Sequence, residues 1–424
     1  MLQTLFYIPS HIGGMPLFGF GLLLAVWTVF SIAMMAWLIR RQGLVADTLG
    51  YVPLLLIVAA AIIWVLPAIS EPRGLPIRGY GAMILLAVTT GTGLAVWRAR
   101  RVGVDPEVIL SLAFWMTLPA IVGARAFYVT EYWSDQYWPA YAEKGLSGLL
   151  LAVLNVANGG LVIYGAFFGG CVGLIAFLRK YRVPLLAMAD LVAPSMMIGL
   201  AIGRIGCLLN GCCFGGMCDL PWAVTFPAGS PVYSSQIARG VMYGFALSGD
   251  PKAAPVVLTV EPHGAADKAG LRPGDRLQSI SGFAEVKTAG DAQYIIAAMF
   301  NENKNLIIKL ADGRKLRLPA VTAPERSHPV HPTQIYSTIN ALLICLFLLT
   351  YDPFRRRDGE LWAWMMTIYP LARFLEEMIR NDEASILRTG MTISQNVSLL
   401  ILVCAVAMWI YVLRQPRGLA FRKT

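Results

Sequence analysis

The sequence predicts an α-helical polytopic membrane protein with a small α/β barrel inserted in one outer loop. Apolar residues make up 57% of the 424 residues and charged residues only 14%, and the mean hydropathy is +0.60. The apolar residues come in long blocks, and one polar segment interrupts them. A chain of this size with so few polar residues cannot cover the surface of a large soluble fold, so the blocks are expected to cross a membrane.

Each apolar block is near the roughly 20 residues that a helix needs to cross a bilayer. The blocks cover residues 17–38, 50–69, 79–97, 108–128, 160–178, 185–206, 335–351, 360–379 and 395–413. We therefore expect about nine membrane spans.

Basic residues lie at alternate ends of these blocks, in clusters at 40–41, 98–101, 179–182, 355–357 and 414–423. The preference of Lys and Arg for the cytoplasmic side places all five clusters inside. The N-terminus is then outside and the C-terminus inside, and the loops at 70–78, 129–159, 207–334 and 380–392 lie outside. The net charge of +10 follows from this topology, so nucleic acid is not expected as a partner. No charge precedes the first apolar block, and a cleaved signal peptide is not expected.

The polar segment from residue 239 to 319 has the pattern of a small α/β barrel. It contains alternating strand-like runs, a Gly-Leu-x-x-Gly-Asp turn, a short amphipathic helix and a hairpin around Asp312-Gly313. The stretch "AADKAGLRPGDRLQSISG", Ala265 to Gly282, resembles a PDZ domain. That resemblance implies a peptide ligand whose C-terminus would be held by the backbone of Tyr243, Gly244 and Phe245.

Polar side chains gather near the outer ends of the apolar blocks. Charges inside spans are costly unless they are paired or face a wet cavity. Arg125, Arg204, Arg373, Glu376, Glu377 and Arg380 are such charges. They could pair with one another or reach the interface. As a set, with tyrosines and glycines at the same helix ends, they favour a basic pocket for an anionic lipid headgroup, with guanidinium groups on the phosphate.

These motifs resemble those of the bacterial prolipoprotein diacylglyceryl transferase family, and the resemblance covers roughly residues 76 to 424. The family signature, Gly-Arg-x-Gly-Asn-Phe-x-Asn-x-Glu-x-x-Gly, is met by Gly203, Arg204, Gly206, Asn210 and Gly215. Supporting matches are "IRGYG" at 77–81, "GGLVIYG" at 159–165, "HPTQIY" at 331–336 and "YPLARFLEEMIR" at 369–380.

The resemblance implies an enzyme of the bacterial inner membrane. It would move the diacylglyceryl group of phosphatidylglycerol to the lipobox cysteine thiol in the signal peptide of a prolipoprotein, and release glycerol 1-phosphate. Phosphatidylglycerol, prolipoproteins and membrane lipids are the partners, and no metal or organic cofactor is required. The implied domains are an N-terminal extension with two spans (1–75), a transferase-like core in two parts (76–234 and 323–424) and the PDZ-like domain (235–322), which would lie on the periplasmic side.

The same resemblance assigns roles to residues. Arg204 and Arg373 would clamp the phosphate, Tyr80 and Tyr369 would orient the headgroup or the thiol, and Asn210 would position the reacting groups. The catalytic set is Arg204, Tyr164, Arg373, Tyr369 and Asn210. The set that would bind phosphatidylglycerol is Tyr80, Arg125, Gly203, Gly206, Gly160, Gly165, His331, Gln334, Glu377 and Arg380.

Three positions depart from the family pattern. Tyr164 stands where members often have a histidine, and Cys207 and Cys212 replace the first asparagine and the glutamate of the signature. A phenol titrates near about 10 and is a poor base at neutral pH unless a cation lowers its pKa. The alternative is therefore a catalytically silent phospholipid-binding scaffold that recruits partners through its PDZ-like domain. A protease or a transporter is less favoured, because the sequence has no His-Glu-x-x-His motif and no repeated halves.

Four of the seven cysteines, Cys207, Cys212, Cys213 and Cys218, fall within twelve residues. Disulfides, free thiols, and metal or redox sites are all open interpretations. On the outer face a disulfide is favoured, with Cys207 or Cys212 paired to Cys218. Zinc is the least favoured, because histidines are few and adjacent cysteines are awkward for one tetrahedral site. Cys171, Cys345 and Cys404 lie within spans and are expected to be packing residues.

Overall fold

The computed structural model describes residues 3–43, 45–154, 162–250, 253–282, 285–380, 385–386 and 391–421. Each of the nine expected spans contains a helix, and in this described part six helices are long and apolar enough to cross a membrane. The chain divides into two compact units. One is built mainly from Met83–Leu118 and Gly170–Thr424, and the other from Leu2–Ala82 and Pro119–Gly169.

The N-terminal part of the second unit is a helical hairpin followed by a short strand. The Trp27 indole N–H donates to the Leu55 carbonyl (3.1 Å) and ties the two arms of the hairpin. The strands are β1 (Thr4–Ile8), β2 (His11–Ile12), β3 (Met15–Pro16) and β4 (Leu75–Arg78), with β1 paired to β4 and β2 to β3. The helices are α1 (Leu22–Gln42), α2 (Ala46–Leu49), α3 (Val52–Ala60), the π-helical η1 (Ala61–Val65) and α4 (Leu66–Ile69).

The next helices run from residue 79 to 181 and include one that was not expected. They are α5 (Gly79–Arg101), α6 (Pro106–Glu131), the π-helical η2 (Trp133–Tyr137), α7 (Trp138–Leu154) and α8 (Ile163–Tyr181). The expectation that residues 129–159 form a loop is wrong for η2 and α7. In the second unit α6 and α8 approach closely through glycine, because a Cβ atom on Gly165 would overlap the backbone of Gly123.

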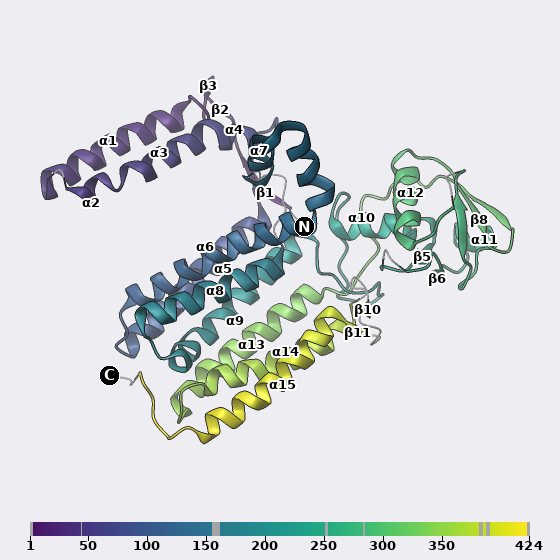
Figure 1. Cartoon of the computed structure of the whole chain (residues 1–424). Helices are drawn as coiled ribbons and strands as arrows, with labels where there is room; N and C mark the ends of the chain where they lie inside the picture. The colour runs from purple at the N-terminus through teal and green to yellow at the C-terminus, as the bar shows by residue number, and fades with distance from the viewer. Residues whose placement is uncertain are drawn as a thin grey trace. The chain divides into compact units, whose positions relative to one another are not determined.

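Four long helices carry the first unit: α9 (Leu185–Asn210), α13 (Thr333–Tyr351), α14 (Glu360–Glu377) and α15 (Ile393–Arg414). Helix α9 packs on α13 and α14, and α14 packs on α15 (Figure 1). Their shared core includes Met197, Ile344, Leu348 and Leu361. The short 3₁₀ helix η4 (Asp352–Phe354) joins α13 to α14, and the strands β10 (Ser385–Ile386) and β11 (Met391–Thr392) precede α15.

The PDZ-like segment forms two small sheets around one apolar core. Strands β5 (Phe245–Leu247) and β6 (Val257–Val260) pair with each other, and β7 (Leu277–Ile280), β8 (Leu306–Leu310) and β9 (Lys315–Leu318) form the other sheet. The helical elements are α10 (Pro231–Ala238), η3 (Val241–Tyr243), α11 (Ala265–Lys268) and α12 (Ala289–Asn301).

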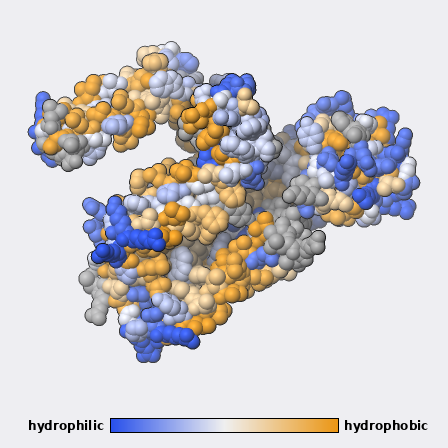
Figure 2. All heavy atoms as spheres, viewed as in Figure 1, coloured by the Kyte–Doolittle hydropathy of each residue, from blue (hydrophilic) through white to orange (hydrophobic). Residues whose placement is uncertain are grey.

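The expected hairpin around Asp312-Gly313 is present as β8 and β9, and Gly313 turns it at a φ of 89°. The expected barrel is not formed by the described strands, since an isolated bridge between Val256 and Arg276 is what links the two sheets. Tyr233 and Ile237 of α10 lie in the core with Leu277 and Ile296, so the packed segment begins with α10. Figure 2 shows hydrophilic side chains over the segment with α12 and β8, and apolar ones over the long helices.

Candidate active site

Helix α9 ends in the signature residues. It terminates at Asn210, four residues later than the sequence predicted, because Gly211 adopts the left-handed conformation (φ 74°) that closes a helix. Arg204 lies half-buried in the last two turns. The Arg204 side chain therefore lies near the C-terminal end of α9 rather than in the middle of the helix.

The loop after α9 is held by the N-terminal end of α13. The Gln334 side-chain N–H donates to the Cys212 carbonyl (2.6 Å), and the Thr333 hydroxyl donates to the Cys213 carbonyl (2.7 Å). The Gly215 N–H of the loop donates to the His331 carbonyl (3.0 Å), and the His331 N–H donates to the Gly216 carbonyl (2.9 Å). A Cβ atom on Gly215 would lie 2.6 Å from the Cβ atom of His331, so the signature glycine is needed for this close approach.

The C-terminal end of α14 brings three charges to the same region. The Glu377 carboxylate lies 2.7 Å from the Arg373 guanidinium and 3.7 Å from that of Arg380. Its side chain is fully enclosed, whereas Arg373 is 11% exposed. Arg373 also donates to the Ser394 hydroxyl of α15 (3.0 Å). The Gly216 N–H donates to the Ile379 carbonyl (2.9 Å) and joins this end to the α9 loop.

These helix ends meet around Arg204. Tyr369 of α14, Cys207 and Cys213 lie near its guanidinium group, and so does the like charge of Arg380, which repels it. The Asn210 side chain hydrogen bonds with the Cys212 thiol. In the first unit the structure thus brings together residues that the sequence predicted from three separate motifs: Arg204, Asn210, His331, Gln334, Tyr369, Arg373, Glu377 and Arg380.

Three of the four clustered thiols lie together in this region. The sulfur atoms of Cys207, Cys212 and Cys213 are all within 4.8 Å of one another. Hydrogen bonds with the other two thiols, and the positive charges of Arg204 and Arg380, lower the pKa of the Cys213 thiol. Cys218 is outside this cluster, and the cysteines are free thiols in the structure, so the proposed pairing with Cys218 stays a prediction.

An apolar cavity of about 730 Å³ lies along α9 between Leu185 and Gly199. Its walls include Ile84, Ala87 and Gly91 of α5, Leu112 of α6, and Val192 and Gly199 of α9. Ile84 also lies 3.9 Å from where a Cβ atom on Gly203 would be. On α9 the lining of the cavity ends at Gly199, about one turn before Gly203 and Arg204.

Other predicted residues lie in the second unit. Tyr80 is 43% exposed in the first turn of α5. Arg125 donates to the carbonyls of Ala152 and Val153 at 2.8 Å, so its guanidinium group holds the C-terminal end of α7. Gly165 serves the helix contact described above. Gly160 and the side chain of Tyr164 lie outside the described residues.

The expected peptide loop of the PDZ-like segment is folded inward. Tyr243 and Phe245 are 1% and 2% exposed. The N–H groups of Tyr243 and Phe245 donate to the Gly240 carbonyl, and that of Gly244 donates to the Val241 carbonyl. The three N–H groups are thus used within the turn, which differs from the expectation that they would meet a carboxylate.

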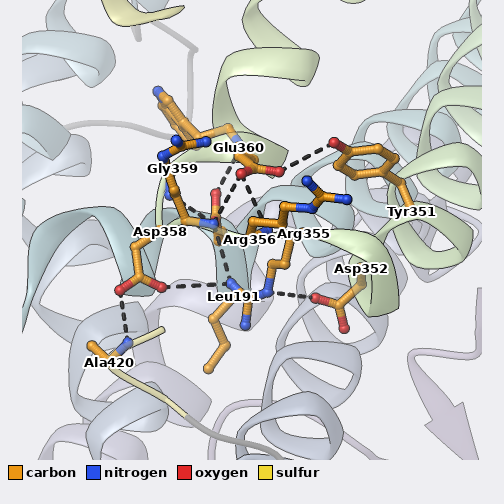
Figure 3. A network of polar contacts seen from close by, with 12 residues as sticks. Leu191, Tyr351, Asp352, Arg355, Arg356, Asp358, Gly359, Glu360 and Ala420 are labelled. Atoms are coloured by element: carbon orange, nitrogen blue, oxygen red, sulfur yellow. Dashed lines mark hydrogen bonds and ion pairs between the residues drawn. The ribbon is translucent and has the colours of Figure 1, made fainter. Parts of the chain in front are cut away.

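A second charged cluster, which the sequence did not reveal, lies near the start of α9. The enclosed Asp190 carboxylate accepts from the Arg355 guanidinium (3.1 Å) and from the N–H groups of Gly359 (2.7 Å) and Trp362 (2.9 Å). Figure 3 shows Arg355 directed at Asp352, and Tyr351 at Glu360.

Because Pro194 has no N–H, it leaves the Asp190 carbonyl free, and Arg98 donates to that carbonyl (2.8 Å). In the sequence, an acidic residue four positions before a proline inside an apolar block could have indicated this cluster.

The charged groups of this cluster are paired in a way that indicates a structural role. Its carboxylates and guanidinium groups bind one another and backbone groups of α9, α14 and the loop between α13 and α14. About 21 Å of helix separates Asp190 from Arg204. We therefore place the candidate active site at the Arg204 end.

The family model for prolipoprotein diacylglyceryl transferase matches residues 67–411. A relative named phosphatidylglycerol–prolipoprotein diacylglyceryl transferase, from Rhodopirellula baltica, is 32% identical over 96% of this chain and 88% of its own length. A protein of the same name from Synechococcus elongatus is 39% identical over 38% of this chain and 52% of its own. The chain belongs to the prolipoprotein diacylglyceryl transferase family.

Proposed function

We propose that the protein transfers the diacylglyceryl group of phosphatidylglycerol to the lipobox cysteine thiol of prolipoproteins and releases glycerol 1-phosphate. The observation that carries this proposal is the convergence of Arg204, Arg373 and Arg380 at the ends of α9 and α14, with an apolar cavity of about 730 Å³ along α9 as far as Gly199. A phospholipid has the matching shape, because its acyl chains need an apolar groove and its phosphate needs a cation at the end of it.

The proposed roles follow from this arrangement. Arg204 and Arg373 bind the phosphate as planar forks, and Glu377 holds Arg373 and Arg380 in place by its ion pairs. Gln334 and His331 fix the loop that carries Asn210 to Gly215. Tyr369 orients the headgroup or the incoming thiol, and Gly203 keeps the α9 surface open beside the lipid. The same headgroup role for Tyr80, and lipid contact for Gly206, rest on the family resemblance alone.

The reaction is a substitution at carbon. The lipobox thiol loses its proton, and the thiolate attacks the diacylglyceryl carbon that carries the phosphate ester. A C–S bond forms as that C–O bond breaks, and glycerol 1-phosphate leaves with the electron pair. Arginines directed at the phosphate stabilise the negative charge that develops there.

The membrane topology is part of the proposal. We infer nine spans in a bacterial inner membrane, with the Arg204 end and the PDZ-like segment outside. The basic last turns of α1, α5, α8 and α15 support this orientation. We keep the domain limits 1–75, 76–234, 235–322 and 323–424 as proposed. A peptide ligand of the PDZ-like segment stays a prediction.

Complementation tests the function. The full chain is expressed in a bacterium depleted of its own transferase, and the mass of a reporter lipoprotein is measured. We expect the reporter to carry a diacylglyceryl group on its lipobox cysteine. An unmodified reporter, with the protein shown to be folded and inserted, would favour the silent phospholipid-binding scaffold instead.

A further inference from the structure

We propose that the thiols of Cys207, Cys212 and Cys213 form a zinc site whose fourth coordination position takes a substrate thiol. The metal site stands on its own geometry. The identity of the fourth ligand rests on the function proposed above.

The three sulfur atoms are close to the spacing that zinc requires. They lie within 4.8 Å of one another, and a tetrahedral site with Zn–S bonds of about 2.3 Å needs sulfur atoms about 3.8 Å apart. The thiols therefore need to close by about 1 Å or less. All three are half-buried, in reach of an ion or a substrate.

The backbone explains how two adjacent cysteines join one cluster. Gly211 is left-handed (φ 74°), and Cys213 is too (φ 57°). A left-handed residue other than glycine is uncommon. This turn places both thiols beside Cys207 on the last turn of α9, which overcomes the difficulty expected for adjacent cysteines in one tetrahedral site.

The loop is also braced from outside. The Cys212 N–H donates to the Cys207 carbonyl (3.1 Å). The Cys212 and Cys213 carbonyls accept from Gln334 and Thr333 of α13 (2.6 and 2.7 Å). Metal sites need such supporting hydrogen bonds to hold their ligands in place.

Ligand type and charge favour zinc with one open position. Sulfur donors select thiophilic ions such as zinc. Among the described residues this group offers three donors, and three protein ligands plus one exchangeable ligand is the pattern of catalytic zinc. Three thiolates on Zn²⁺ leave a net charge of about −1, which the guanidinium group of Arg204, two turns or less from Cys207 and Asn210 on α9, would offset.

The open position would solve the problem of thiol activation. A thiol that coordinates zinc loses its proton, which here passes to solvent, and the bound thiolate then makes the C–S bond described above. The thioether product is neutral and a weaker ligand, so water replaces it. Zinc stays divalent throughout, and no general base is needed at the position of Tyr164.

Metal analysis of the full chain in detergent tests the site without reference to activity. The protein is purified without chelators, and bound metals are measured by mass spectrometry. We expect about one zinc per chain. Cys207→Ser, Cys212→Ser and Cys213→Ser should each lower the zinc affinity by at least about tenfold, whereas Cys218→Ser should keep it.

Cobalt substitution tests the fourth position. Metal-free protein loaded with Co²⁺ should show thiolate-to-cobalt absorption, and a lipobox peptide with its cysteine should shift the cobalt bands. The same peptide with serine should leave them unchanged. Zinc loss in the three variants with no response to the cysteine peptide would keep the metal site but reject its proposed ligand.

Several results would overturn the proposal even if transferase activity is normal. They are a wild-type protein without zinc, copper in its place, a disulfide in the purified protein that involves Cys207, Cys212 or Cys213, including the pairing with Cys218, or full zinc content in Cys213→Ser. Because metal content is read directly, an inactive protein that binds zinc would contradict only the proposed function.

Discussion

The side chain of Gln334, at the start of α13, donates a hydrogen bond of 2.6 Å to the backbone carbonyl of Cys212 in the loop after α9. Gln334 is fully buried. Together with the hydrogen bond from Thr333 to the Cys213 carbonyl, this contact fixes the signature loop to a second helix, and it joins two motifs that lie 122 residues apart.

Gln334→Ala should therefore loosen the candidate active site. The substitution leaves the Cys212 carbonyl without this donor, at a cost of about 1 to 3 kcal/mol. We expect a lower thermal midpoint in detergent together with lower transferase activity. Gln293→Ala is the matched control, because Gln293 also donates a 2.6 Å hydrogen bond to a backbone carbonyl, that of Ser248 in the PDZ-like segment. Equal activity losses in both variants would show that the Gln334 contact has no special role.

The Glu377 carboxylate should be needed to hold two arginines. Glu377→Gln removes the charge between Arg373 and Arg380, and breaking a buried ion pair costs about 3 to 5 kcal/mol. We expect a clear fall in the thermal midpoint and a higher KM for phosphatidylglycerol. Glu302→Gln is the control, because the Glu302–Lys304 pair is more than half exposed on both sides and should contribute less than about 1 kcal/mol. Similar thermal midpoints for the two variants would contradict this role.

The contact between α6 and α8 should not tolerate a methyl group. A Cβ atom on Gly165 would overlap the Gly123 backbone, whereas one on Gly93 would meet nothing within 4 Å. Overpacking costs about 1 to 3 kcal/mol, so Gly165→Ala should unfold at a lower temperature. Gly93→Ala should be neutral or slightly stabilising, since alanine favours helix. A stable Gly165→Ala protein would mean that these helices can separate without cost.

The topology gives opposite results at two exposed positions. Tyr294 on α12 is 79% exposed, and Phe354 between α13 and α14 is 72% exposed. We expect a membrane-impermeant thiol reagent to label Tyr294→Cys in intact spheroplasts above the level of the parent protein. Phe354→Cys should be labelled above that level only after lysis. The reverse pattern would overturn the orientation.

Sequence alone predicted the long apolar helices and the polar motifs near their ends. The apolar blocks and the basic clusters are local features, so the long helices and the motifs at their ends could be predicted. The convergence of Arg204, Gln334 and Arg373 depended on the topology. The sequence does not show which backbone group Gln334 binds, because that depends on the exact end of α9 at Gly211.

Other features could not be predicted because they depend on backbone conformation or tertiary contacts. Helix α7 contains Gly145 at a positive φ of 63°, and the sequence of this helix was predicted to be part of a loop. Arg125 was predicted to bind phosphate, but it donates to the end of that unexpected helix. The clustering of Cys212 with Cys213 depends on the left-handed backbone of Cys213, which residue type does not predict.

The most direct test of the account measures the reaction itself. Purified protein in phosphatidylglycerol nanodiscs is mixed with a lipobox peptide, and peptide mass and glycerol 1-phosphate are followed. We predict one diacylglyceryl group on the cysteine peptide with an equal amount of glycerol 1-phosphate, and none on the serine peptide. Arg204→Lys should be slower by at least about tenfold, or about 1.4 kcal/mol, while Arg317→Lys, at an exposed position of β9, should match the wild type. A folded wild-type protein that yields no adduct, or an Arg204→Lys variant with normal turnover, would contradict the account.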